Sequence, residues 1–133
     1  MADRDDLPDD LKKFRESYVE LFGTLPPMPA ARFAFAAEVD PEGLRLVEQL
    51  RAHAFHSHVF DAKTTNLILF GMLLVERLQP AAQVHAFAAR RAGATWEELQ
   101  KVVELASATG ALVAANTGSG MLQALREKEK QPG

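Results

Sequence analysis

The side chains of this sequence that can exchange protons near neutral pH are its histidines, and three of them stand in suggestive places. His85 lies in QPAAQVHAFAARRAGAT (residues 79–95), and His56 and His58 form a His-x-His in the connection FHSHVF. An imidazole titrates near pH 7, so each is a candidate general acid or base. The chain has no cysteine. Disulfides, cysteine nucleophiles and thiol redox pairs are therefore excluded.

The surroundings of His85 leave two interpretations open. If its segment is helical, the residues one turn away on the same face are four alanines, Ala81, Ala82, Ala88 and Ala89. Either helix backbones pack closely there and His85 is a core histidine, or the small side chains leave a cavity beside a general acid or base.

His56 and His58, together with His85, suggest a three-histidine metal site with an open position as one alternative. A His-x-His pair arises easily by chance, and no helical i, i+4 pair supports it. We therefore expect no metal and no other cofactor. The preferred interpretation is that one of the two loop histidines points into the site as a second acid/base or carboxylate binder, while the other is solvated.

Four further residues have both a structural and a functional interpretation. Asn66 falls on an apolar helix face, where a buried amide ties two helices together or donates to a substrate carbonyl. Glu76 and Arg77 end the same segment, either as a solvated helix end or with Arg77 binding a substrate carboxylate. Asn116 caps the last helix or faces the site.

Apolar periodicity predicts an all-α chain, with Asp40, Asp61 and the capping box TWEE at helix starts. The segment 24–37, with three prolines, is expected to be an apolar strap that carries Met28, Phe33 and Phe35. We expect helices over about residues 8–22, 41–54, 62–77, 80–92, 95–109 and 113–128.

The helix faces follow from the same periodicity. The helix at 41–54 should turn Leu46, Leu50 and His53 inward. The helix after Asp61 is apolar all round and should be central and buried, and Gly110 should interrupt the chain before the last helix.

Length and charge agree with one globular domain. The 133 residues are read as a single domain, with an N-terminal helix and proline-rich strap at 1–39 and a helical core at 40–133. A net charge of −3 gives no reason to expect nucleic-acid or membrane binding. The start is polar and the longest apolar run, Leu67–Val75, is too short to span a bilayer, so a cytoplasmic location is expected.

Three segments in order, DAKTTNLILFGMLL, VHAFAARRAGATWEELQKVVELA and GALVAAN, resemble the carboxymuconolactone decarboxylase family, which shares its fold with the AhpD-type alkylhydroperoxidases. The resemblance implies an AhpD-like bundle of about six helices that assembles as a homotrimer or hexamer. Redox members carry a Cys-x-x-Cys pair and a relay glutamate. Counted back from His85, those positions hold Leu78, Ala81 and Asn66.

The resemblance therefore implies a cysteine-less lyase of the decarboxylase type rather than a thiol peroxidase. Its substrate would be a small carboxylated lactone or ring-cleavage product of aromatic catabolism. His85, His56 and Asn66 are the expected catalytic residues, and His58, Arg77, Glu76 and Asn116 the expected substrate-binding residues. The alternatives are isomerisation, hydration or hydrolysis on the same scaffold, a metal-dependent enzyme, and a non-catalytic helical binding protein.

Overall fold

The computed structural model describes residues 6–133, and every regular element in that range is an α-helix. The expected all-α class is confirmed. The helices are α1 (Asp9–Phe22), α2 (Pro27–Val39), α3 (Pro41–Phe55), α4 (Ala62–Val75), α5 (Gln79–Arg91) and α6 (Trp96–Glu129). Within the described range, none of them is long and apolar enough to cross a membrane. The single-domain boundaries stay a prediction, and their first five residues lie outside the described part.

The helix starts follow the local capping signals. The Asp40 carboxylate accepts from the Gly43 N–H at 3.0 Å, and the Asp61 carboxylate accepts from the Thr64 N–H at 2.7 Å. Thr95 and Glu98 form the reciprocal capping box. These bonds occupy N–H groups that a first helical turn otherwise leaves unpaired. The predicted starts of α3, α4 and α6 are confirmed.

The expected strap at 24–37 is wrong, because most of it is helix α2. Pro26 is the N-cap, Pro27 is the first helical residue and Pro29 lies in the first turn. The N–H groups of a first turn have no partner inside the helix, so prolines there cost no hydrogen bond. Of the three apolar residues assigned to the strap, Phe33 is buried, whereas Met28 and Phe35 are exposed.

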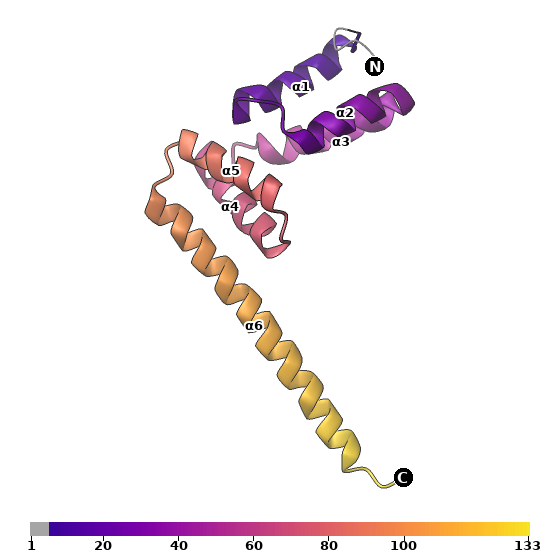
Figure 1. Ribbon diagram of the computed structural model, residues 1–133, viewed down its shortest axis with the longest axis vertical. Helices are drawn as coiled ribbons and strands as arrows, with labels where there is room; N and C mark the ends of the chain where they lie inside the picture. The colour runs from indigo at the N-terminus through magenta and orange to yellow at the C-terminus, as the bar shows by residue number, and fades with distance from the viewer. Residues whose placement is uncertain (1–5) are drawn as a thin grey trace.

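Figure 1 shows α1, α2 and α3 gathered at one end, α4 and α5 below them, and α6 reaching away from both groups. A short turn at residues 76–78 joins α4 to α5. α4 packs on both α5 and α6, while α1 packs on α5. The largest apolar cluster joins α1, α2, α3 and α5 through Leu11, Tyr18, Phe22, Phe33, Leu44 and Ala88.

The inward face of α3 was predicted wrongly. Leu46, Leu50 and His53 are exposed, and the buried residues of α3 are Leu44 and Glu48. The helix carries apolar residues on two faces, and periodicity cannot tell which of them the chain itself covers. α4 is likewise not fully enclosed, since Met72 on it is 58% exposed.

The expected interruption at Gly110 is also wrong, because α6 runs unbroken for 34 residues. A glycine inside a helix weakens it by only about 1 kcal/mol relative to alanine, which the neighbouring turns outweigh. The number of helices in the described chain is still about six, because the added α2 offsets the merging of the last two predicted helices.

Two glycines offer a matched test of this continuity. Gly110→Ala is expected to stabilise the protein by about 0.5–1 kcal/mol, because the position is helical and a Cβ there meets no atom within 4 Å. Gly93→Ala is expected to destabilise it by about 1 kcal/mol, because φ is +99° at this residue. Urea unfolding of both variants measures the two signs. Destabilisation by Gly110→Ala would contradict a continuous α6.

Candidate functional site

His85 and Asn66 face each other across the packed pair α4 and α5. His85 Nδ1 lies 2.9 Å from Asn66 Oδ1, and both side chains are buried, with exposed fractions of 7% and 4%. The structure thus brings together two of the residues singled out in the sequence. This hydrogen bond joins α4 to α5, as the structural interpretation of Asn66 predicted.

The Asn66 amide determines which nitrogen of His85 carries the proton. Its Nδ2 donates to the carbonyl oxygen of Ala62 at 2.8 Å, so the amide oxygen must be the atom that points at the ring. An oxygen acceptor requires a donor, and His85 Nδ1 is therefore protonated. In the neutral ring, Nε2 then keeps its lone pair. Nε2 has no hydrogen-bond partner in the described part of the chain.

The alanines around His85 permit close packing. Ala82, Ala88 and Ala89 are buried, and aromatic rings from two other helices stand edge-on to the imidazole. The ring centroids of Phe22 and Phe55 lie 5.2 Å and 5.8 Å from that of His85. Of the two interpretations of the alanine setting, the structure shows the one in which helices approach closely.

Enclosure makes His85 a weak base. Burial lowers the pKa of His85 from its ordinary 6.5 to about 4, and the positive charge of Arg51 contributes to the shift. The imidazole is therefore uncharged at pH 7. Titration near neutrality, expected from the ordinary properties of the residue, is corrected to titration in the acidic range.

A second polar group, which we call the Glu48 cluster, lies near Phe55, whose ring centre is 5.6 Å from the Arg51 guanidinium carbon. It consists of Tyr18 on α1, Arg32 on α2, and Glu48 and Arg51 on α3. Glu48 is fully buried and accepts hydrogen bonds from the Tyr18 hydroxyl at 2.8 Å and from Arg32. The guanidinium of Arg51 stacks 3.5 Å from the centre of the Tyr18 ring, and burial raises the pKa of Tyr18 to about 12.

The Glu48 cluster has unused hydrogen-bonding capacity. Arg51 Nη2, Arg32 Nε and Glu48 Oε2 are buried without a hydrogen-bond partner. Two guanidinium groups face one carboxylate, so the cluster has a net charge of +1. Buried charge without full pairing is costly, which makes this a place where an anion or water would be stabilised.

Sequence reasoning missed the Glu48 cluster. A usable signal was present, because Leu44, Glu48, Arg51 and Phe55 recur at helical spacing on one face of α3. The apolar period instead predicted the face of Leu46, Leu50 and His53 as the inward side of this helix.

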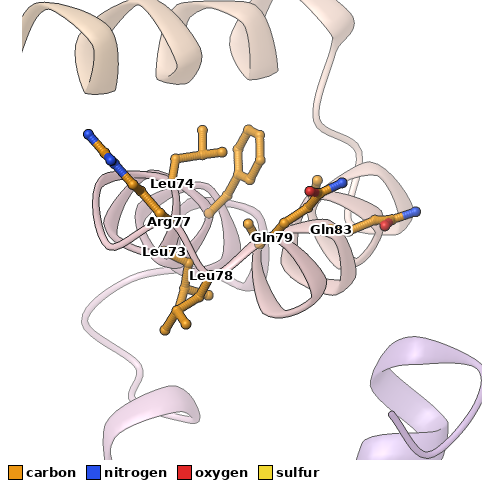
Figure 2. Close-up of a pocket in the computed structure, with 9 residues that line it drawn as sticks. Leu73, Leu74, Arg77, Leu78, Gln79 and Gln83 are labelled. Atoms are coloured by element: carbon orange, nitrogen blue, oxygen red, sulfur yellow. The ribbon is translucent and has the colours of Figure 1, made fainter. Parts of the chain in front are cut away.

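The Arg77 pocket, as we call the hollow beside the α4–α5 turn, has a volume of about 640 Å³. Figure 2 shows Arg77 and Leu74 directed to one side of the turn and Leu73 and Leu78 to the other. Gln79 and Gln83 supply further polar groups in its wall. Ala82 also lines it, but His85, one turn further along α5, does not. Arg77 thus lies at a pocket that is separate from the enclosed histidine, and its role as a binder of a substrate carboxylate stays a prediction.

The remaining predicted residues are not brought to His85. His56 follows the last residue of α3 and His58 lies in the next loop, and both are exposed. Residues 6–133 contain no group of three or more histidine, acidic or cysteine side chains placed to hold a metal ion. Glu76 is exposed where α4 ends. Asn116 lies exposed in the middle of α6, so its expected role as a helix cap is wrong.

Comparison with known proteins gives one finding. A sequence model described as the carboxymuconolactone decarboxylase family matches residues 41–124. No curated protein and no solved structure gives a match. The matched range includes α3, α4, α5 and most of α6, and therefore includes Asn66 and His85.

The buried neutral histidine makes stability depend on pH. The pKa of His85 is lower in the folded chain than in the unfolded chain, so protons bind the unfolded state more strongly below pH 6.5. The stabilisation is complete above pH 6.5 and is lost as the pH falls toward 4. Between pH 7.5 and 5.5, wild type should lose on the order of 1 kcal/mol more stability than His85→Gln does.

Urea unfolding at the two pH values measures this difference. Exposed His53 provides the control, and His53→Gln should keep the wild-type pH dependence. Equal pH dependence in wild type and His85→Gln would show that the imidazole is not held neutral by burial.

Proposed function

We propose a function from the premise that this chain belongs to the carboxymuconolactone decarboxylase family. The proposed activity is that of a cofactor-independent lyase, which releases carbon dioxide from a small carboxylated lactone or a related ring-cleavage product. The observation that carries the proposal is the Asn66–His85 hydrogen bond, which leaves Nε2 of an uncharged imidazole free in apolar surroundings. The chain has no thiol for peroxidase chemistry.

The proton balance assigns His85 its role. Loss of carbon dioxide breaks a carbon–carbon bond and leaves the electron pair on an enolate-like carbon, which must gain one proton. Free His85 is neutral at pH 7, but a carboxylate beside it favours the imidazolium. The histidine therefore takes up a proton with the substrate anion and donates it to that carbon, returning to the neutral form.

Arg51 is the proposed binder of the substrate carboxylate. Its Nη2 is buried without a hydrogen-bond partner, and its charge already influences His85. The guanidinium carbon lies 5.6 Å from the centre of the Phe55 ring, and the centre of the His85 ring lies 5.8 Å from it. Phe55 is only partly buried. Rotation of that one ring is the proposed way for a small ligand to reach both groups.

The close packing around His85 supports a second candidate, a non-catalytic binding protein. In that case the ligand is a small anion held in the Arg77 pocket by Arg77, Gln79 and Gln83, and His85 is a structural residue. Isomerisation, hydration or hydrolysis would use the same imidazole and differs only in the substrate. Action in the cytoplasm, a place in aromatic catabolism and assembly as a homotrimer or hexamer stay predictions, as do the roles given to His56 and His58.

Turnover by a His85 variant separates the two candidates. Small carboxylated lactones are screened for carbon dioxide release by wild type, His85→Gln and the control His53→Gln. His85→Gln is expected to reduce kcat by at least about 100-fold, the usual contribution of general acid–base catalysis, while His53→Gln keeps it. Circular dichroism verifies that each variant is folded. Undiminished turnover by folded His85→Gln would remove His85 from the mechanism.

Substrate binding gives the complementary measurement. Under the lyase proposal, Arg51→Met weakens binding of the lactone acid by about tenfold or more, whereas Arg77→Met changes it little. If the chain is instead a non-catalytic binding protein, Arg77→Met weakens ligand binding and Arg51→Met changes it little. His85→Gln then leaves the affinity unchanged. Isothermal titration of the three variants distinguishes these patterns.

The pH profile tests the uptake of a proton with the substrate. Because free His85 has a pKa of about 4, kcat/KM for an anionic substrate should fall about tenfold per pH unit above it, or about 100-fold from pH 5.5 to 7.5. kcat should fall at higher pH than kcat/KM does, because the bound carboxylate raises the pKa of the imidazole. A flat kcat/KM over this range would contradict the mechanism.

A further inference from the structure

The guanidinium of Arg51 is held at one end and open at the other. Its Nη1 donates to Ser17 Oγ at 3.2 Å and lies 3.7 Å from Glu48 Oε2. The Ser17 hydroxyl donates to the carbonyl oxygen of Phe14 at 2.6 Å, so towards Arg51 it acts only as an acceptor. Nη2 is buried and has no hydrogen-bond partner among residues 6–133. It is thus the buried end of Arg51 at which a ligand can bind.

Tyr18 sets the plane of that guanidinium. The guanidinium carbon of Arg51 lies 3.5 Å from the centre of the Tyr18 ring, a distance at which the two flat groups stack. The ring itself has little freedom, because its hydroxyl donates to Glu48 at 2.8 Å and only 3% of the residue is exposed. Phe33 stands edge-on to it, with 6.0 Å between the ring centres. A fixed ring therefore restricts the flexible Arg51 side chain to orientations that keep the stack.

The helix α1 contacts both groups of the proposed site. Tyr18 meets Arg51 on one turn of α1. Phe22, on the next turn, stands edge-on to His85 with 5.2 Å between the ring centres. Four residues of an α-helix rise about 6 Å. Successive turns of one helix thus tie the positions of the proposed carboxylate binder and proton carrier to each other.

α1 lies outside the part of the chain that matches the family. The matched residues are 41–124, which include Arg51 and His85, whereas α1 ends at Phe22. The matched sequence pattern therefore includes the two side chains proposed to meet the ligand, but not the helix that holds them. The contribution of α1 to the site is not predicted by family membership.

We propose that Tyr18 is a positioning residue for carboxylate recognition, whose ring holds Arg51 so that Nη2 meets one carboxylate group of the ligand. The inference rests on the proposed role of Arg51 as the carboxylate binder. Orientation matters because a guanidinium binds a carboxylate through N–H groups in a fixed plane. In the Glu48 cluster, two guanidinium groups and one carboxylate leave one positive charge, which one ligand carboxylate neutralises. The ligand class is thus a small organic acid rather than its uncharged analogue.

Two probes that differ in one charged group test the proposal. γ-Butyrolactone carboxylate and uncharged γ-butyrolactone are titrated into the full chain, and NMR shifts measure the affinities. Wild type should bind the acid at least about tenfold more tightly than the neutral lactone. Tyr18→Leu removes the ring and should reduce this preference about fivefold or more, whereas Tyr18→Phe keeps the ring and should retain it. Val19→Ala, at an exposed position of α1, is the control that should also retain it.

A second substitution removes the oriented plane without changing α1. Arg51→Lys keeps the positive charge but has no planar group to stack, so it should reduce the preference as Tyr18→Leu does. Circular dichroism verifies that each variant is folded. If Tyr18→Leu does not fold, Arg51→Lys and Tyr18→Phe decide the question.

The outcomes separate this inference from the proposed function. Full retention of the preference in folded Tyr18→Leu or in Arg51→Lys, together with its loss in Arg51→Met, overturns the positioning role and leaves Arg51 as the binder. An equal loss of affinity for both probes in Tyr18→Leu indicates a structural role and overturns it too, as does loss of the preference in Tyr18→Phe. No preference in wild type, or an undiminished preference in Arg51→Met, removes Arg51 as the carboxylate binder, and the proposed function then fails as well.

Discussion

The hydrogen bond between Asn66 and His85 determines how the centre of this protein is organised. Two polar side chains are buried where α4 packs on α5, and each supplies the partner that the other needs. Because the amide nitrogen is engaged by Ala62, the proton on the imidazole is confined to Nδ1. The alanines of α5 let α1 and α3 bring aromatic rings against that imidazole. The neutral state of the histidine, its low basicity and its free Nε2 all follow from this arrangement.

The helix starts were predictable because a capping interaction spans only three residues. The side chains of Asp40, Asp61 and Thr95 each accept a hydrogen bond from the backbone N–H three residues later, so each helix start is visible in a short stretch of sequence. The proximity of Asn66 and His85 also followed from the family register, since the two positions were recognised together. Errors occurred where a local signal has two outcomes. Prolines end a helix or begin one, as at Pro27, and Gly110 weakens the helix too little to end it between neighbouring helical turns.

The Glu48 cluster could not be assembled from sequence, because it joins residues from three helices. Tyr18 and Glu48 are 30 residues apart, and no local pattern connects them. The face of α3 presented a different difficulty. Leu46 and Leu50 follow a good apolar period and yet are exposed in the single chain. Apolar periodicity reports that a surface will be covered, but it carries no information on whether the cover is the same chain or another one.

Position 66 also has a consequence for the evolution of the site. An amide and a carboxylate have nearly the same shape, and they differ in one group, NH₂ or O⁻. A carboxylate at this position would accept from Nδ1 as the amide oxygen does, but its charge would favour a protonated ring. It would also remove the side-chain donor that the Ala62 carbonyl has at present. A single exchange at residue 66 therefore converts an uncharged hydrogen-bonded pair into an ion pair, with little change in the packing of the helices.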